Sequence, residues 1–332
     1  MVAKPRKGLP IAAFILFVYS LLMTVITIFI QEPIKIFYNS PEATLEYTSI
    51  PIYSIIVYLV YAILSLIWIR TLSKDNTNNE NNKTGRTIVI LIIILSVVVF
   101  PLLNAGVTII ISQYKGMAAL ASASIVDNMV STLTIIPNAV AIVFLFLSLG
   151  SQIKKNRGNE LSYYQEDGLT KESKNRQRVS FILYAAAAIA TIISIILQAL
   201  FKKFFTSDQD VLACFSLPIE RIISLGIAFV LSLVYLIVLT ASRSLKVRKT
   251  IGLISVISML AISFILSYYL GVYIQNTISH KWGVIAMASY STIQQVVLML
   301  TNPLSKPAWL FMLLSVGRLF GKSPLVDIAK DR

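Results

Sequence analysis

The feature that most constrains this chain is a series of long apolar runs that contain no charged residue. The first extends from Leu9 to Ile30, and runs of similar length recur along all 332 residues. A helix needs roughly 20 such residues to cross the hydrocarbon core of a bilayer. Charged residues make up only 13% of the chain, where a soluble domain has about 25%. We therefore predict an all-α integral membrane protein.

The chain also contains an internal repeat. Residues 116–150 recur as residues 283–317, and without a gap the two stretches agree at 13 of 35 positions. The same offset of 167 matches residues 64–66 with residues 231–233, both Leu-Ser-Leu. A repeat of this kind sets the architecture of the whole chain. It predicts two four-helix units with the same orientation in the membrane, because each contains an even number of spans.

The predicted fold is eight transmembrane helices arranged as two tandem parallel four-helix repeats (4+4). We expect a first repeat in residues 1–150, a cytoplasmic polar linker in residues 151–178 and a second repeat in residues 179–332. The expected spans are residues 9–30, 50–69, 87–111, 116–150, 179–201, 217–240, 250–274 and 283–320.

Two local features qualify this plan. Residues 71–86 are hydrophilic enough to predict a solvated loop. The repeated stretch would extend about 52 Å as a helix against roughly 30 Å of hydrocarbon, so we expect it to break, tilt or project beyond the membrane. Pro137, Pro303 and Pro307 are the natural places for a break.

The net charge of +14 follows the expected topology. With the amino terminus inside, the cytoplasmic segments hold 22 Lys and Arg against 8 Asp and Glu, and the external segments hold 7 against 7. This bias obeys the positive-inside rule and places both termini of a multi-pass cell-membrane protein in the cytoplasm. Because the topology explains the positive charge, we expect no nucleic-acid partner. The bilayer is the expected partner, with anionic lipid headgroups on the cytoplasmic side; a homo-oligomer or a membrane partner stays open.

Polar residues recur at helical spacing in both copies of the repeated stretch. The candidate pathway residues are Ser124, Asp127, Asn128, Ser131, Thr134 and Asn138 in the first copy, and Ser291, Gln294, Gln295, Thr301, Asn302, Ser305 and Lys306 in the second. Polar groups at membrane depth usually line cavities or ion routes, which predicts a polar route between the two repeats. Two alternatives remain: a polar face outside the membrane, or hydrogen bonds between packed helices.

Glu220 and Arg221 depart from the repeat, since Tyr53 and Ser54 stand at the matching positions. They form a candidate outer rim of a substrate route. The alternative is that both lie at the outer membrane interface, where the long side chain of Arg221 would extend toward water.

The sequence excludes several kinds of chemistry. A single cysteine and a single histidine cannot make an internal disulfide or a paired-histidine metal site. We therefore expect no cofactor and no metal, and no catalytic motif is present. The favoured function is permeation or transport of a small solute or ion. The alternative is a non-catalytic membrane scaffold or a subunit of a larger complex, and an enzyme acting on lipid is a third hypothesis.

Overall fold

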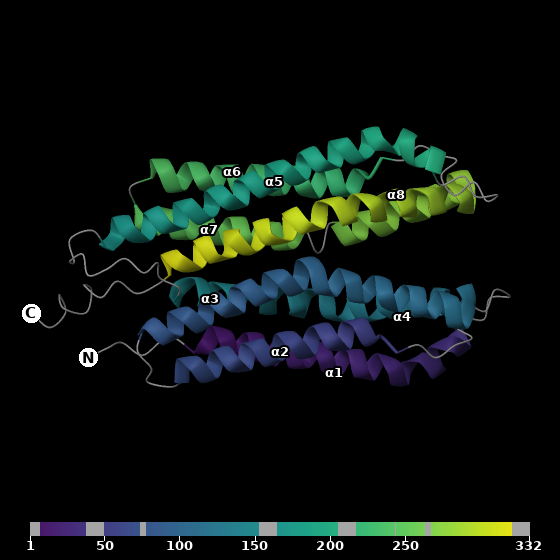
Figure 1. Cartoon of the computed structure of the whole chain (residues 1–332), viewed down its shortest axis with the longest axis horizontal. Helices are drawn as coiled ribbons and strands as arrows, with labels where there is room; N and C mark the ends of the chain where they lie inside the picture. Colours follow the sequence, from purple (N-terminus) through teal and green to yellow (C-terminus); the bar gives the residue numbers. More distant parts are fainter. Residues whose placement is uncertain are drawn as a thin grey trace, which may run out of the picture. The chain divides into compact units, whose positions relative to one another are not determined.

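The structure is a computed structural model that describes residues 7–37, 50–73, 78–152, 165–204, 217–242, 244–262 and 267–320. This described part is 96% helical and contains no strand. Its elements are α1 (Gly8–Phe37), α2 (Ile52–Ser73), α3 (Asn78–Ile94), the π-helical turn η1 (Leu95–Val99), α4 (Phe100–Gln152), α5 (Gln165–Phe204), α6 (Ile219–Ala241), α7 (Leu245–Leu260) and α8 (Ser267–Leu319), as Figure 1 shows.

Six stretches of the described chain are long and apolar enough to cross a membrane. They are Gly8–Gln31, Ile52–Ser73, Asn81–Leu103, Thr132–Gln152, Thr170–Leu197 and Ile219–Ala241. The last two expected spans, residues 250–274 and 283–320, are not among them. α7 ends at Leu260, residues 263–266 lie outside the described part, and the end of α8 carries Lys306 and Arg318. The described chain is thus an all-helical polytopic membrane protein with six candidate spans.

Helix α5 buries mainly small and polar side chains and exposes large apolar ones. Along α5, Ser180, Ala187 and Thr191 are buried, while Ile182 and Ile196 are 62% and 69% exposed. In water this arrangement would leave a large apolar surface uncovered. In a bilayer it is favourable, because lipid solvates the isoleucines and the small residues let helices approach closely.

The chain divides into two compact units, Met1–Lys154 and Lys155–Arg332. In unit 1, α1 packs against α2 and α4. The ring of Phe17 stacks on Tyr61 at 5.3 Å, and Tyr61 meets Phe100 edge-on at 5.7 Å. Trp68 of α2 donates a hydrogen bond to the Ser148 hydroxyl of α4 at 3.0 Å. An aromatic core and a buried hydrogen bond between α2 and α4 therefore help to hold unit 1 together.

The chain reverses direction between η1 and the middle of α4. Tyr61 bonds Ser96 at 2.8 Å, and Tyr58, one turn earlier in α2, bonds Thr134 at 2.6 Å. A straight helix would place Thr134 roughly 57 Å from Ser96 at about 1.5 Å per residue, which the two contacts do not allow. The run from Ser96 to Thr134 therefore leaves the level of Tyr61 and comes back to it.

In unit 2, α5 packs most extensively against α8 and also against α6. Ser180 donates to the Ala308 carbonyl at 2.7 Å, and Ser173 bonds the Ser315 hydroxyl at 2.9 Å. These two pairs show that α5 and α8 run antiparallel, since the number rises on one helix as it falls on the other. α6 and α7 approach closely at Gly252, where a Cβ atom would lie 2.9 Å from the ring of Tyr235.

Two expectations about local structure are wrong, and the expected linker is partly helical. Residues 71–86 are helical from Asn78 onward, and Asn81 and Asn82 are buried. Residues 165–178 of the expected linker belong to α5, and Ser173 among them bonds Ser315 of α8. The prolines do not end their helices either: Pro137 lies inside α4, and Pro303 and Pro307 lie inside α8.

Candidate functional site

A cluster of polar and charged side chains lies inside unit 2, centred on Arg221 near the start of α6. Arg221 donates from Nε and Nη2 to the Thr301 hydroxyl, at 3.0 and 2.9 Å. Nη2 also donates to the Asn302 side-chain carbonyl at 3.1 Å and to the Ser305 hydroxyl at 2.8 Å. All three acceptors belong to α8. The guanidinium therefore joins α6 to α8 through neutral oxygens alone.

Glu220 precedes Arg221 but points to another partner. Its carboxylate accepts a hydrogen bond from the Tyr290 hydroxyl of α8. Glu220 is 5% exposed, and its second oxygen, Oε1, has no hydrogen-bond partner among the described residues. No carboxylate of the described chain forms an ion pair with Arg221. Adjacent residues on a helix point in different directions, which explains why these two do not neutralise each other.

Lys306 adds a second cation to the same place. It follows Ser305 in α8 and is partly buried, and its charge interacts with that of Arg221. Within the described part of the chain, its ammonium has neither a hydrogen bond nor an ion pair. Arg221 also interacts electrostatically with the buried Tyr184 of α5. Hereafter the Arg221 cluster means Glu220, Arg221, Tyr290, Thr301, Asn302, Ser305 and Lys306.

Unit 1 has a neutral arrangement at the matching positions. Thr134 and Thr301 correspond in the sequence repeat, and each donates to the backbone carbonyl four residues earlier, at 2.6 and 2.7 Å. The oxygen of Thr134 then bonds the phenol of Tyr58, whereas that of Thr301 accepts from Arg221. The two threonines share a helical position but meet a neutral partner in one unit and a cation in the other.

The structure brings together six of the residues that the sequence singled out. Glu220 and Arg221, the candidate rim, lie with Thr301, Asn302, Ser305 and Lys306 of the candidate pathway. The guanidinium of Arg221 bonds side chains of α8 within unit 2. The two candidate rim residues and four of the candidate pathway residues therefore belong to one cluster.

Two members of this neighbourhood, Tyr290 and Tyr184, were missed by the sequence analysis. A signal was present for Tyr290, which replaces Ala123 of the first copy. Lys306 replaces Ala139, and Asn302 replaces Ile135. Departures from the repeat thus gather at the cluster, and comparing the copies position by position could have found it.

Thr134 is buried and bonds Tyr58, and the other remaining candidate pathway residues divide into two groups. Asn138 is partly exposed, and its side-chain oxygen has no partner among the described residues. The other group lies on described backbone of α4 and α8, but its side chains are outside the described part: Ser124, Asp127, Asn128, Ser131, Ser291, Gln294 and Gln295. The predicted route between the repeats stays a prediction.

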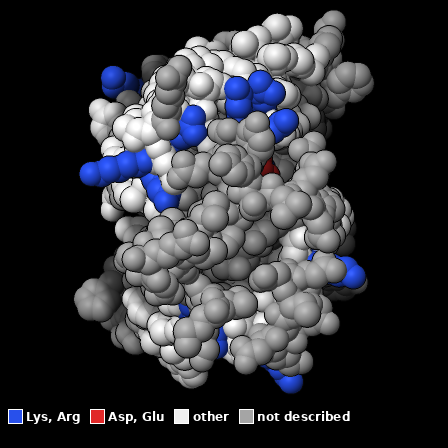
Figure 2. Space-filling model, turned by 90° about the vertical axis from the view of Figure 1, so that its left-hand side faces the viewer, with Lys and Arg blue, Asp and Glu red and all other residues white. Residues whose placement is uncertain are grey.

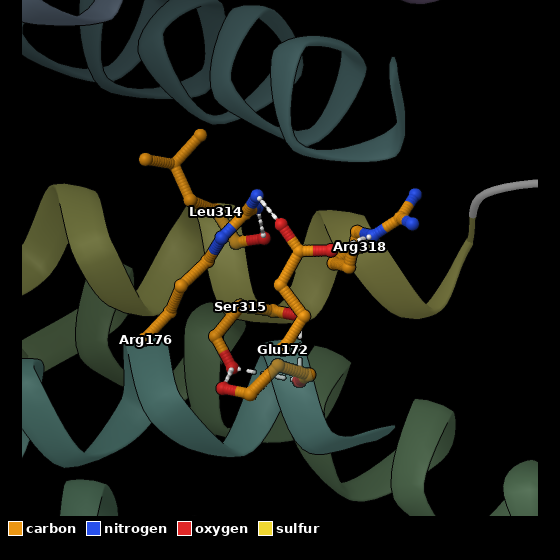
Figure 3. A network of polar contacts seen from close by, with 6 residues as sticks. Glu172, Arg176, Leu314, Ser315 and Arg318 are labelled. Atoms are coloured by element: carbon orange, nitrogen blue, oxygen red, sulfur yellow. Dashed lines mark hydrogen bonds and ion pairs between the residues drawn. The ribbon is translucent and has the colours of Figure 1, made fainter. Parts of the chain in front are cut away.

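A second polar network joins the first part of α5 to the end of α8, as Figure 3 shows. The Glu172 carboxylate lies between Arg176, at 2.7 Å, and Arg318, at 2.9 Å. Arg176 also donates to the Leu314 carbonyl at 3.0 Å. Each charge here has an opposite charge beside it, unlike Arg221. We interpret this network as a clamp between α5 and the end of α8.

The exposed charges near this clamp are mostly basic. Lys171, Arg178 and Lys246 are exposed at the ends of α5 and α7. Figure 2 views the protein from this side and, among the described residues, shows several Lys and Arg side chains and little Asp or Glu.

No metal centre is evident in the part of the chain that the structure describes, where no three His, Cys, Asp or Glu side chains gather. No family model, curated protein or solved structure matches this chain. The function is therefore inferred from the charges and hydrogen bonds of the Arg221 cluster.

Proposed function

We propose that this polytopic membrane protein is a permeation or transport protein for a small solute or ion, and not an enzyme. The solute contacts the Arg221 cluster of unit 2. In this proposal the protein has eight spans in the cell membrane as two parallel four-helix repeats, with both termini in the cytoplasm. The polar route between the repeats that the sequence predicts is part of this proposal.

The observation that carries the proposal is the unpaired charge of Arg221 in a candidate span. Arg221 belongs to the span Ile219–Ala241, and within the described chain it has only neutral hydrogen-bond partners. A charged side chain inside a membrane costs several kcal/mol, so such residues are rare there and usually serve a solute or ion. A charge kept only for stability would have an opposite charge beside it, as Glu172 has.

Helix lengths and buried positions support the repeat. α4 and α8 each contain 53 residues, and they begin at residues 100 and 267, which differ by the repeat offset of 167. Thr24 and Thr27 are buried in α1, and their counterparts Thr191 and Ser194 are buried in α5. Two helices that bury the same positions have the same rotation about their axes within their own units.

A membrane scaffold is the second candidate, and one observation favours it. Thr134, a candidate pathway residue, is fully buried and bonds Tyr58 within unit 1. Ser148 likewise bonds Trp68. Polar residues of this kind join packed helices and need no solute. A scaffold would use the Arg221 cluster only to hold α6 against α8.

Flux into vesicles distinguishes the two candidates. The purified protein would be reconstituted alone and tested with small anionic, neutral and cationic solutes. We expect the wild-type protein to take up one of these three classes of solute. Arg221→Gln should lose at least about nine-tenths of that uptake, because removing a charge-assisted hydrogen bond typically lowers the affinity by a factor of ten or more. Lys281→Gln, an exposed cation on α8, is the matched control and should keep full uptake. No uptake of any solute, with a protein partner that co-purifies stably, would favour the scaffold.

A further inference from the structure

We propose that the Arg221 cluster binds an anionic group with two or more oxygens, a carboxylate or a phosphate. This inference rests on the proposed function and names the substrate class. It also holds by itself as a statement about binding, because the charges of the cluster would attract such a group whether or not the protein moves it.

The cluster has hydrogen-bond donors that no described residue uses. A guanidinium carries five N–H donors in a planar fork that fits two oxygens of one carboxylate or phosphate. Arg221 uses Nε and Nη2 for α8, and within the described chain Nη1 makes no hydrogen bond. Lys306 brings three further ammonium donors without a described partner. Two cations with free donors next to each other form the usual framework of an oxyanion site.

The charge of the cluster also favours an anion. Arg221 and Lys306 repel each other, and Glu220, the only carboxylate of the cluster, holds Tyr290 instead of either cation. The cluster therefore carries an excess of one positive charge. An anion between the two cations would relieve the repulsion and meet the unused donors, so its binding energy repays part of the cost of keeping the charges buried.

Other ligand classes fit less well. A cation would be repelled by both Arg221 and Lys306. A neutral solute could accept hydrogen bonds from them but would leave the charges uncompensated in a medium of low dielectric constant. The hydroxyls of Thr301 and Ser305, already held by Arg221, keep the guanidinium in place without neutralising it. They position the binding group.

The anionic group has two sources: a free solute such as inorganic phosphate or a small carboxylate, and the headgroup of an anionic lipid that enters from the membrane. Both present the same oxygens to Arg221 and Lys306. The binding experiment therefore needs one arm for each source.

The first arm measures binding of inorganic phosphate and of succinate to the full-length protein in detergent, by calorimetry at constant ionic strength. The second arm measures retained phosphatidylglycerol by native mass spectrometry after reconstitution with equal phosphatidylglycerol and phosphatidylcholine. Both arms compare the wild type with Arg221→Gln, Arg221→Lys and Lys306→Gln. Lys281→Gln is the matched control, since it removes an exposed cation from the same helix.

We expect Arg221→Gln to weaken binding at least about tenfold and Lys306→Gln about threefold to tenfold, with no change in Lys281→Gln. Arg221→Lys keeps the charge but loses the fork, and it should give an intermediate loss. If Arg221→Gln does not fold, Arg221→Lys and Lys306→Gln still test the site. Dependence on Arg221 in the first arm identifies a free solute, and dependence in the second identifies a lipid headgroup.

Binding in neither arm, or binding that Arg221 and Lys306 do not affect, would overturn the inference. Failure of the proposed function would look different. Phosphate binding that depends on Arg221, with no uptake of any solute into vesicles, would leave an anion site in a protein that does not transport. Uptake of neutral solutes with no anion binding would keep the transport function and reject the anion site.

Discussion

Glu220 and Arg221 are consecutive residues of α6, yet their opposite charges do not pair. Glu220 accepts from Tyr290, while Arg221 donates to Thr301, Asn302 and Ser305. The two side chains diverge because successive residues lie about 100° apart around a helix. This divergence leaves the guanidinium in unit 2 with neutral partners alone. It is the geometric origin of the site that we propose.

Removing the Arg221 charge should have little effect on stability. The buried charge costs free energy, and its hydrogen bonds return part of it, so Arg221→Gln should change the free energy of unfolding by no more than about 1 kcal/mol in either direction. Thermal unfolding in detergent without added anion measures this change. A loss of about 3 kcal/mol or more would show that Arg221 serves mainly to hold α6 to α8.

Glu220→Gln should strengthen anion binding. The substitution removes the only negative charge of the cluster but keeps an oxygen that can accept from Tyr290. Because one unfavourable charge near the anion disappears, we expect the affinity for phosphate to rise by about threefold or more. Calorimetric titration of the variant with phosphate measures it. An affinity below that of the wild type would mean that Glu220 takes part in binding, and not only Arg221 and Lys306.

Tyr290→Phe should destabilise unit 2. Glu220 is buried, and the Tyr290 hydroxyl is its hydrogen-bond donor within the described chain. Leaving a buried carboxylate without a donor costs about 1–3 kcal/mol. Tyr273→Phe is the matched control, because Tyr273 lies on the same helix and is 69% exposed. Equal melting temperatures for the two variants would show that the Glu220–Tyr290 bond contributes nothing.

Gly252→Ala should destabilise the contact between α6 and α7. The new Cβ atom would lie 2.9 Å from the ring of Tyr235, which is fully buried and cannot move aside without cost. We expect a loss of about 1–3 kcal/mol. Gly226→Ala is the matched control, since nothing lies within 4 Å of its Cβ position, and alanine favours a helix. Chemical denaturation in mixed micelles compares them, and a stabilised Gly252→Ala variant would contradict this packing.

Glu172→Gln should loosen the clamp between α5 and the end of α8. The carboxylate bonds Arg176 and Arg318 at once, so its neutralisation weakens two ion pairs. Both pairs are partly exposed, and we therefore expect a modest loss of about 0.5–2 kcal/mol that shrinks at high salt. Lys171→Gln, its exposed neighbour, should change nothing. A Glu172→Gln variant as stable as the wild type at low salt would rule out the clamp.

The membrane class and the buried faces of the helices were predictable from the sequence. The apolar runs predict the candidate spans, because span length is set by the bilayer. The spacing of Thr24 and Thr27 in α1, and of Thr191 and Ser194 in α5, follows the helical period. These residues are buried in the structure. Local periodicity carries this information without any knowledge of the partner helix.

The Arg221 cluster was predictable only as separate pieces. Glu220 and Arg221 departed from the repeat, and Thr301 and Lys306 belonged to a polar stripe, but these pairs lie about 80 positions apart in the chain. Bringing them together requires the rotation of α6 against α8, which depends on packing across the whole unit. Hydrophilic composition also gave no sign that residues 165–178 begin a helix in which Ser173 and Arg176 bond α8.

The most direct test of the central claim is thiol labelling of Thr301→Cys in a Cys214→Ser background. Small anionic and cationic methanethiosulfonates of similar size would be applied to intact cells. Thr134→Cys, the matching position of unit 1, serves as the neutral control. If a solute reaches the Arg221 cluster, Thr301→Cys should react about tenfold faster with the anionic reagent, and adding Arg221→Gln should remove that preference. Absence of reaction at Thr301→Cys, or equal rates with both reagents, would contradict the account.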